Sequence, residues 1–392
     1  MNSTILIKNA VVITPTEKWA RGWLLAREGK IELLGRGSPP DLGEVETIDA
    51  GGLILLPGFI DVHAHGWGGR GTMDADPEAL RAMATSYAGH GVTAFLASTW
   101  TESRENIRAV LEVVAEIQGP QPRGATILGV HLEGPYLNAA KCGAQDTQHI
   151  RIADREEALD FLDIGVIRLM AVAPEIEENH WLIEECVRRG ITVSAAHTAA
   201  TYDQIRRAVA LGITHSTHTY NAMVGLNHRE PGTVGAMMTS PEIRCELIAD
   251  NFHVHPAAMQ ILFAAKGPDG VMLITDAVES AGLPDGDYKM GERPILVRNG
   301  TIRLPDGTIA GSSIPFNRGV RNFMQATGQP LEAIWKASSL NAARSIHIST
   351  HKGSLEVGKD ADLVLVDEHV NVHLTIAEGQ IVHTILGRAN NG

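Results

Sequence analysis

Histidine is the residue type with the clearest chemical meaning in this sequence. The 392 residues include 17 histidines but only seven phenylalanines, so imidazole is not used here as ordinary filler. Two of the histidines form the segment His63-Ala64-His65. On a strand, residues two apart face the same side, so both imidazoles can reach one metal ion from one wall. The pair alone is weak evidence, because surface and core histidines are commoner than ligands.

Four more potential ligands or acids each end a short apolar segment, namely Glu133, His197, His218 and Asp276. From residue 53 onward, such segments alternate with amphipathic helical ones, which predicts parallel strands joined by crossover helices. Helices are expected, for example, over 78–89 and 102–117. The predicted strands are residues 57–63, 93–99, 127–133, 167–173, 192–197, 213–218, 246–250 and 272–276. Eight such units predict a (β/α)8 barrel of the TIM type.

The carboxyl ends of the strands in such a barrel meet at one rim, where the active site is built. We therefore expect a single cluster of nitrogen and oxygen donors at that rim. These donors suit Zn²⁺ or Fe²⁺, and no cysteine is near enough in sequence to supply a thiolate. The side chains predicted to converge are His63, His65, Glu133, His197, His218 and Asp276.

Asp276 is the residue that we expect to move protons. A bound metal lowers the pKa of its water to about 7, and a neighbouring carboxylate can take the remaining proton. The same acid, once protonated, can pass that proton to a leaving amine. The alternative reading is that Asp276 is a plain metal ligand or a structural acid at the end of a strand.

Both ends of the chain predict β structure, over 4–12, 23–27 and 30–34 and again over 362–366, 370–374 and 380–386. Residues 27–31 (Arg-Glu-Gly-Lys-Ile) resemble residues 377–381 (Ala-Glu-Gly-Gln-Ile). We expect 1–54 and 352–392 to form one small β-sandwich domain beside a barrel of residues 55–351, since chain ends commonly lie close together. Two independent β caps are the alternative. A β insertion is expected near 287–311.

Composition narrows the function classes. The formal net charge of −13 disfavours a surface that follows nucleic-acid phosphates or anionic lipid. No stretch approaches the roughly 20 apolar residues that span a bilayer, and the N-terminus shows no secretion signal. The three cysteines, Cys142, Cys186 and Cys245, stand far apart and form no disulfide framework. We expect a cytoplasmic protein without nucleic-acid or membrane partners.

Several of these segments together resemble a known family. They are residues 63–65, 131–135 (His-Leu-Glu-Gly-Pro), His197, 217–223 (Thr-His-Thr-Tyr-Asn-Ala-Met), 249–253 and 275–277. The sequence resembles the N-acetylglucosamine-6-phosphate deacetylases of the amidohydrolase superfamily over nearly its whole length. The Glu-Gly-Pro and Thr-Tyr-Asn-Ala-Met segments are the most specific. Residues 57–61 extend the likeness, whereas residues 353–363 are common to many amidohydrolases.

The resemblance implies a metal site and a reaction. It implies a divalent ion, Zn or Fe, held by Glu133, His197 and His218. Family members with a histidine pair on the first strand can hold a second ion, so His63 and His65 imply one or two ions per subunit, with Glu133 as the bridging ligand. The aspartate at the position of Asp276 is the general base and acid in the family.

The resemblance also implies a sugar-phosphate site. It assigns Asn221, Ala222, Arg229 and His253 to the sugar phosphate, with Arg229 reaching across from the neighbouring subunit of a homodimer. The guanidinium of Arg229 can hold phosphate oxygens in two parallel bonds. From the sequence alone, however, a surface ion pair with Glu230 or another loop acid is the favoured explanation of that arginine, and only the resemblance reverses this preference.

One departure from the family pattern concerns the loop after Glu133. Many members place there a histidine that helps to polarise the scissile carbonyl, whereas this chain has Ala144 and Gln145. We expect both residues to contact substrate. A glutamine can still donate a hydrogen bond but carries no charge. Asn251, where glycine is common, is a second and milder difference.

The expected reaction is hydrolysis of the acetamide of N-acetylglucosamine 6-phosphate to glucosamine 6-phosphate and acetate. The galacto isomer is an alternative substrate, and a related amidohydrolase acting on another N-acyl or cyclic amide is a second alternative. Relatives of that second kind commonly carry a carbamylated lysine on the fourth strand, and residues 167–174 contain no lysine. A third alternative is a barrel that binds without turnover, but such a chain should have lost metal ligands.

Overall fold

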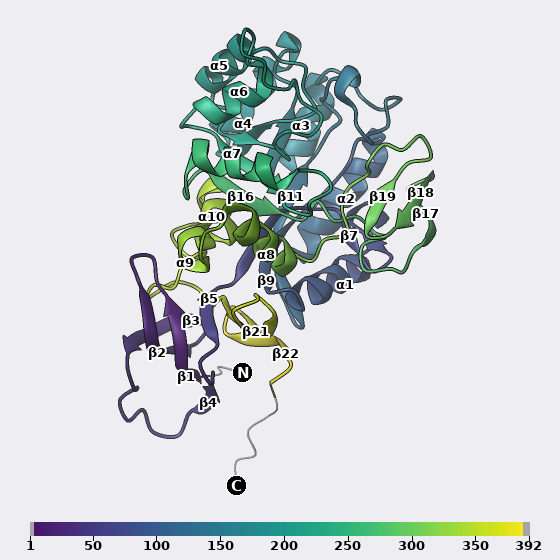
Figure 1. The fold of residues 1–392 in the computed structure, drawn as a ribbon. Helices are drawn as coiled ribbons and strands as arrows, with labels where there is room; N and C mark the ends of the chain where they lie inside the picture. The colour runs from purple at the N-terminus through teal and green to yellow at the C-terminus, as the bar shows by residue number, and fades with distance from the viewer. Residues whose placement is uncertain (1–3, 387–392) are drawn as a thin grey trace.

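The computed structural model describes residues 4–386 and shows a barrel with a smaller sheet beside it (Figure 1). In Figure 1 the purple N-terminal strands and the yellow C-terminal strands lie together below the barrel. The barrel occupies the middle of the chain, in blue, teal and green. The two ends of the chain therefore lie together beside the barrel, as the sequence predicts.

Eight parallel strands form the barrel, in the order in which they occur along the chain. They are β6 (Phe59–Ala64), β9 (Val92–Ser98), β11 (Gly124–Leu132), β12 (Ile167–Val172), β13 (Thr192–Ala195), β14 (His215–Ser216), β15 (Arg244–Ile248) and β16 (Val271–Ile274). A short strand, β10 (Gly119–Gln121), pairs antiparallel with β11. The predicted (β/α)8 fold is confirmed, and each predicted strand overlaps one of these eight.

The first and last strands close the barrel through the residues at their carboxyl ends. The amide N of Asp276 donates to the carbonyl of His63 at 2.8 Å, and the amide N of His65 donates to the carbonyl of Ala277 at 2.8 Å. Below them, the Thr275 hydroxyl donates to the buried Asp61 carboxylate at 2.6 Å. These bonds fix the first and last strands against each other at the rim where the candidate ligands lie.

Helices follow the barrel strands and cover the outside of the sheet (Figure 1). They are α1 (Pro77–Ala88), α2 (Arg104–Ile117), α3 (Arg155–Asp163), α4 (His180–Arg188), α5 (Tyr202–Leu211), α6 (Gly232–Thr239), α7 (Pro256–Lys266), α8 (Phe316–Thr327), α9 (Leu331–Ile334) and α10 (Leu340–Ser345). The second helix begins two residues later than the predicted 102, because the Ser103 side chain accepts the amide hydrogen of Asn106 and caps it.

Apolar side chains fill the barrel interior. Ile60, Leu96, Leu169 and Ile248 come from four different strands and belong to one buried cluster. Ala343 of α10 packs in the same cluster. Because the interior is packed rather than hollow, ligands can enter only at the rim formed by the carboxyl ends of the strands.

Strands from both ends of the chain join in one sheet of eight. They are β1 (Thr4–Ile13), β2 (Lys18–Arg27), β3 (Lys30–Arg36), β4 (Glu46–Asp49), β5 (Ile54–Pro57), β20 (Leu363–Val366), β21 (Val372–Ala377) and β22 (Gln380–Thr384). The β5 strand pairs with β1 on one side and β20 on the other. Two independent caps are therefore ruled out, while the proposed domain boundaries at 54/55 and 351/352 stay a prediction.

Side chains on the two faces of this sheet alternate between two cores, as strand geometry requires. Leu55 and Leu363 belong to the core of the terminal sheet. Their neighbours Leu56 and Val364 belong instead to the large core of the barrel. The sheet is thereby fixed against the barrel by ordinary burial of apolar surface.

The two similar turns at residues 27–31 and 377–381 pack against each other. Gly29 and Gly379 have φ of 78° and 77°, which side chains with a Cβ rarely adopt. A Cβ added to Gly379 would lie 2.8 Å from the Cα of Gly29. The likeness in the sequence thus corresponds to two equivalent hairpin turns in close contact.

Three short antiparallel strands lie within the predicted insertion, namely β17 (Gly286–Met290), β18 (Arg293–Arg298) and β19 (Thr301–Arg303). Met290 and Ile295 of this sheet pack with Trp100, which follows β9 of the barrel. The insertion therefore covers one side of the barrel rim.

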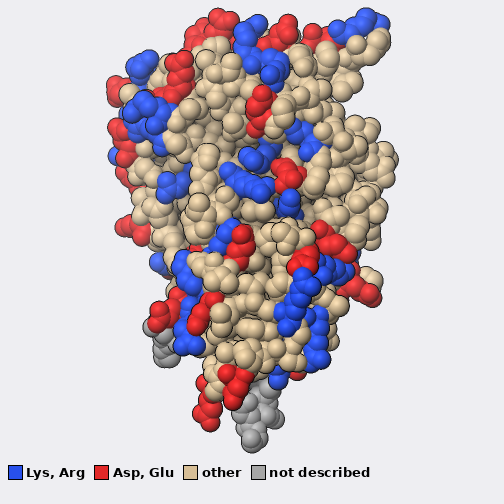
Figure 2. All heavy atoms as spheres, turned by 90° about the vertical axis from the view of Figure 1, so that its left-hand side faces the viewer, with Lys and Arg blue, Asp and Glu red and all other residues tan. Residues whose placement is uncertain are grey.

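No helix within residues 4–386 is long and apolar enough to cross a membrane. On the face shown in Figure 2, basic and acidic side chains are interspersed over most of the surface. Some basic side chains form ion pairs with acids, as Lys336 and Arg344 do with Asp269. Such interspersed charge offers no continuous basic track on the face drawn.

Candidate active site

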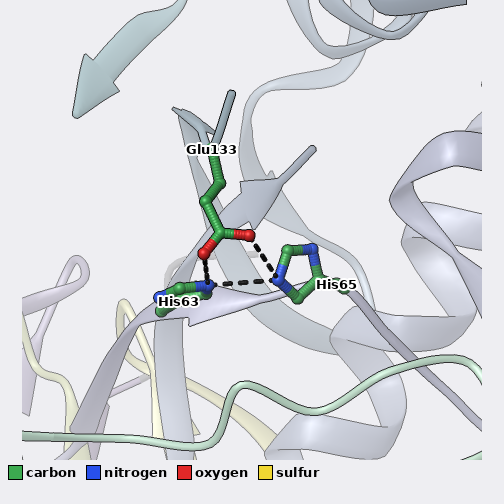
Figure 3. Close-up of side chains that lie close together, drawn as sticks. All are labelled: His63, His65 and Glu133. Atoms are coloured by element: carbon green, nitrogen blue, oxygen red, sulfur yellow. Dashed lines mark hydrogen bonds and ion pairs between the residues drawn. The ribbon is translucent and has the colours of Figure 1, made fainter. Parts of the chain in front are cut away.

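The side chains predicted to converge do meet at the carboxyl ends of the barrel strands. Figure 3 shows His63 and His65 facing the carboxylate of Glu133, which directly follows β11. His63 Nε2 lies 3.4 Å from Glu133 Oε1, and His65 Nε2 lies 3.5 Å from Glu133 Oε2. The two Nε2 atoms are 3.1 Å apart. All three residues are buried, so one carboxylate is shared by two buried imidazoles.

The other two histidines approach the same carboxylate. His197 Nε2 lies 3.3 Å and His218 Nε2 lies 3.0 Å from Glu133 Oε1. Their own Nε2 atoms are 3.0 Å apart. Two groups of three, each with ligand atoms within 4.8 Å of one another, therefore share Glu133. One group contains His63 and His65, and the other contains His197 and His218.

The far ring nitrogens show which tautomer these imidazoles take in the neutral form that binds a metal ion. Nδ1 of His63 faces the Glu246 carboxylate at 2.9 Å, Nδ1 of His65 faces a backbone carbonyl at 3.2 Å, and Nδ1 of His197 faces the Lys141 carbonyl at 2.8 Å. These oxygens only accept, so each Nδ1 carries the hydrogen of the neutral ring and each Nε2 keeps its lone pair. Three Nε2 lone pairs around one carboxylate fit a divalent cation.

Backbone strain sets the direction of three of these side chains. His197, His218 and Asp276 have φ of 40°, 28° and 50°, in the left-handed region that residues with a Cβ rarely adopt. Each stands two residues beyond the assigned end of its strand. The sequence predicts strands that include these residues. The strands end two residues earlier because the left-handed backbone conformation interrupts them. Such strain concentrates at functional sites.

Asp276 lies beside the histidine pair. Its Oδ1 is 3.2 Å from His65 Nε2 and 3.6 Å from His63 Nε2. Burial acts to raise the pKa of Asp276, but the nearby imidazoles of His63 and His65 outweigh it and hold the pKa below the ordinary value. This carboxylate is therefore ionised and able to accept a proton at neutral pH.

Glu133 is the electrostatic centre of the cluster. Burial alone would raise the pKa of its carboxyl group, but His63 and the hydrogen bonds from His197 and His218 hold that pKa well below the usual value. The carboxylate is thus kept as an anion inside the protein. Once the surrounding imidazoles give up their Nε2 hydrogens, this ionised carboxylate and the ring nitrogens form the donor set that a cation needs.

A cavity of about 300 Å³ opens above this cluster. His65, Glu133, His197, His218 and Asp276 line its floor. Met290 and Arg293 of the inserted sheet line it from the other side, with Trp100 beside them. The cavity is large enough for a small organic substrate and too small for a polymer.

Comparison with known proteins places the chain in a family. The amidohydrolase family model matches residues 54–382. The N-acetylglucosamine-6-phosphate deacetylase of Bacillus subtilis is 37% identical over 97% of this chain and 98% of its own length. The N-acetylgalactosamine-6-phosphate deacetylase of Escherichia coli O157:H7 is 37% identical over 84% of this chain and 87% of its own.

Solved structures agree. A variant of the N-acetyl-D-glucosamine-6-phosphate deacetylase of Mycobacterium smegmatis, in complex with N-acetyl-D-glucosamine 6-phosphate, superposes with a TM-score of 0.91. It is 32% identical, and the match covers 97% of this chain and 100% of that one. The chain belongs to the N-acetylglucosamine-6-phosphate deacetylase family. The resemblance seen in the motifs is thereby confirmed.

Two hydrogen bonds fix the position of Gln145. Its Oε1 accepts the amide hydrogen of Thr101 at 2.7 Å, so its Nε2 must point the other way. That Nε2 donates to Glu133 Oε2 at 2.6 Å. Ala144 and Gln145 both line the cavity, and the Ala144 carbonyl accepts a hydrogen bond from Arg293. Gln145 is thus an oriented donor beside the cluster.

The residues that the family pattern assigns to the sugar phosphate divide into two groups. Asn221, Ala222 and His253 line the cavity. Arg229 is exposed, is absent from the cavity wall of its own chain, and contacts His228 Nε2 at 2.8 Å. The sequence alternative, an ion pair with Glu230, is not among the contacts of Arg229; Glu230 instead accepts the amide hydrogen of Tyr202 at 3.0 Å.

His253 is held in place by a carboxylate of its own segment. Its Nδ1 lies 2.7 Å from Asp250 Oδ2, and the Asp250 carboxylate also accepts the amide hydrogen of His253. Burial acts to lower the pKa of His253, but this hydrogen bond and the charges of Asp250 and Asp276 raise it above the ordinary value. The imidazole is therefore readily protonated at the cavity wall.

Sequence reasoning missed several residues of this site. Trp100 and Arg293 reach the cavity from a strand end and from the insertion, and no periodic pattern marks either of them. Glu246 contacts His63 from inside the barrel, and here a signal exists. An acid within a strand predicted to be buried on both faces needs a buried partner.

Proposed function

We propose that this chain is a metal-dependent hydrolase that removes the acetyl group of N-acetylglucosamine 6-phosphate, giving glucosamine 6-phosphate and acetate. The observation that carries the proposal is the convergence of four imidazole Nε2 atoms on the Glu133 carboxylate, next to Asp276. Relatives of this name match nearly the whole chain, and one of them was solved with that sugar phosphate bound.

The proposed ligands are Glu133, His197 and His218 for one ion, and His63 and His65 with Glu133 for a second. Nitrogen and oxygen donors without a thiolate favour Zn²⁺ or Fe²⁺, with one or two ions per subunit. When bound, such an ion lowers the pKa of its water to about 7 and polarises the scissile carbonyl. Gln145 Nε2 is placed to orient Glu133 and to donate to a substrate oxygen.

Asp276 is the proposed general base and acid. Its ionised Oδ1 faces the two imidazoles of β6 and opens on the cavity. The carboxylate takes a proton from the attacking water and then donates it to the nitrogen of the leaving amine, so that glucosamine leaves as a neutral amine. The low pKa of Asp276 keeps it in the basic form between turnovers.

Recognition of the phosphate is proposed to involve two subunits. Asn221 and Ala222 offer polar and backbone groups at the cavity wall, and protonated His253 offers a charge-assisted hydrogen bond. Arg229 is exposed and stands apart from the cavity of its own chain, which supports its use in the neighbouring cavity of a homodimer. We further propose a cytoplasmic location, in keeping with the three unpaired thiols.

The galacto isomer is the second candidate substrate. A relative named N-acetylgalactosamine-6-phosphate deacetylase is 37% identical over 84% of this chain, against 37% over 97% for the N-acetylglucosamine-6-phosphate deacetylase of Bacillus subtilis. The two sugars differ only in the configuration at C4, so the choice depends on hydrogen bonds to one hydroxyl group.

The test is acetate release from four substrates, namely the two N-acetylhexosamine 6-phosphates and the two unphosphorylated sugars. We expect the gluco 6-phosphate to have the highest kcat/KM and the unphosphorylated sugars to be poor. A higher kcat/KM for the galacto 6-phosphate would favour the second candidate. Acetate release from none of the four would reject the proposed function.

A further inference from the structure

Glu246 is a buried acid that the proposed reaction does not use. It lies on β15 with no exposed surface, inside the barrel and below the metal ligands. An ionised carboxylate in such a place requires several donors, because burying an unpaired charge is costly. Its hydrogen-bond partners therefore show what it is for.

One oxygen of Glu246 contacts both halves of the metal cluster. Oε2 lies 2.9 Å from His63 Nδ1 and accepts the backbone amide hydrogen of His218 at 2.9 Å. His63 and His218 belong to the two different groups of ligands that share Glu133. A single buried oxygen thus holds one ligand of each group. It accepts a hydrogen bond from the ring of His63 and another from the backbone amide of His218.

The other oxygen of Glu246 is held from the bottom of the barrel. Oε1 lies 2.7 Å from His215 Nε2, and His215 Nδ1 lies 2.6 Å from the hydroxyl of Ser345 at the end of α10. The carboxylate can only accept, so His215 Nε2 donates to it, and in the neutral ring Nδ1 then accepts from Ser345. Glu246 consequently accepts from both sides, from His215 at Oε1 and from His63 at Oε2, and the direction of each bond is fixed.

That direction fixes the tautomer of His63. With its hydrogen on Nδ1, the ring keeps the Nε2 lone pair facing Glu133. Without Glu246, the hydrogen could move to Nε2, and a cation would first have to displace it. The backbone bond to His218 matters in the same way, because His218 has a strained φ of 28° that needs support from outside the turn.

We propose that Glu246 is a positioning residue for the metal centre, which sets metal affinity by orienting His63 and anchoring His218 without touching metal or substrate. The inference rests on the proposed metal-dependent function. It assigns a role to the His215–Ser345 pair as well, since that pair fixes the far oxygen of the carboxylate. Substitution of a residue that orients metal ligands through hydrogen bonds typically changes metal affinity by about 10- to 100-fold.

The same region offers a competing arrangement. His63, His131 and Glu246 also have ligand atoms within 4.8 Å of one another, and His131 Nε2 is buried without a hydrogen-bond partner. In that arrangement Glu246 would itself bind an additional ion. Metal stoichiometry separates the two, because a positioning residue leaves the number of ions unchanged.

The experiment is a zinc titration of the metal-free full-length protein in competition with a chromophoric chelator. The variants are Glu246→Ala and Glu246→Gln, with Ile248→Val as a control on the same strand that perturbs the barrel core without changing the polar chain. We expect zinc affinity to fall about 10- to 100-fold in Glu246→Ala, with partial recovery in Glu246→Gln, whose amide oxygen still accepts from His63 and His218. Ile248→Val should bind zinc like the unmodified protein.

Melting temperatures with and without zinc separate positioning from general stability. Glu246→Gln should lose more of the zinc-induced rise in melting temperature than Ile248→Val does. If Glu246→Ala does not fold, Glu246→Gln and His215→Gln decide, and both should bind zinc more weakly than the unmodified protein. Unchanged affinity in the folded variants, or loss of an additional zinc equivalent with Glu246, would overturn the proposal.

These outcomes are distinct from failure of the proposed function. If the protein binds zinc, and Glu246 sets that affinity, but none of the four sugars releases acetate, the substrate is wrong and the positioning role stands. If acetate is released and Glu246→Gln binds zinc normally, the function stands and the positioning role is wrong.

Discussion

The two ends of the cavity are built in different ways. At the metal end, every side chain comes from the end of a barrel strand and is buried, and oxygens facing Nδ1 fix the rings of His63, His65 and His197. At the proposed phosphate end, Asn221 and His253 lie on loops, and Arg229 is exposed and does not line the cavity of its own chain. The barrel therefore preorganises the chemistry, whereas anion recognition depends on loops and, as proposed, on a second subunit.

The largest effect is expected from a substitution among the proposed metal ligands. His197→Asn removes the ring whose Nε2 faces Glu133 and should abolish binding of at least one metal ion. Acetate release should fall by about 10⁴-fold or more, because both the activated water and the polarised carbonyl are lost. Metal analysis and acetate assays check this. His180→Asn is the matched control, since that histidine binds only the Pro174 carbonyl on the outside of the barrel.

The next effect separates proton transfer from metal binding at the same end. Asp276→Asn keeps the shape of the side chain but cannot accept a proton, so kcat should fall by about 10²- to 10⁴-fold. Metal content should stay unchanged, because Asp276 is proposed as base rather than ligand. A variant that loses metal together with activity would instead make Asp276 a ligand, which is the alternative that the sequence left open.

The metal end could be predicted from sequence because its geometry follows from topology. Once eight strands alternate with helices, the carboxyl ends of those strands must converge, and His63, Glu133 and His218 stand at three of them. The strained backbone of His218 could not be foreseen, since it arises from contacts made only in the folded barrel. Glu246 could have been found, because it interrupts a segment otherwise suited to burial.

The phosphate end could be assigned only through the family resemblance. A loop arginine such as Arg229 has no periodic pattern, and its position depends on which chain it serves. Arg293 was missed for a related reason: it reaches the cavity from the inserted sheet, and its hydrogen bond to the Ala144 carbonyl spans about 150 residues of sequence. Contacts between loops depend on how distant parts of the chain are arranged in space, and local sequence does not encode that arrangement.

A third prediction sharpens the contrast by testing the phosphate end directly. Arg229→Ala should raise KM for the 6-phosphate by roughly 10- to 100-fold, since a charge-assisted bidentate contact is worth about 1.5–3 kcal/mol. kcat and metal content should change little, and the unphosphorylated sugars should be unaffected. An equal loss on phosphorylated and unphosphorylated sugars would show that Arg229 does not bind the phosphate.

Mixed dimers decide whether that arginine acts across the interface. Consider a heterodimer of an Arg229→Ala subunit and an Asp276→Asn subunit. If Arg229 acts in the neighbouring cavity, one cavity of this heterodimer contains both an intact Arg229 and an intact Asp276. Such a heterodimer should recover about half of the activity of the unmodified dimer, since one of its two cavities is complete. A kcat/KM no higher than half that of the Arg229→Ala homodimer would place Arg229 in its own subunit's cavity.

The smallest expected effect is a pH dependence at the phosphate end. The pKa of His253 is raised, since the hydrogen bond and charge of Asp250, with Asp276, outweigh the opposing effects of burial and Arg303. The imidazolium thus persists above the ordinary pKa of about 6.5, and its contribution should be lost as pH rises through the raised pKa. KM for the 6-phosphate, divided by KM for the unphosphorylated sugar, should rise roughly three- to tenfold over that interval. In His253→Gln the same ratio should be flat, because the amide does not titrate. A ratio that rises equally in both proteins would assign the titration to another group and leave the phosphate to uncharged donors and Arg229.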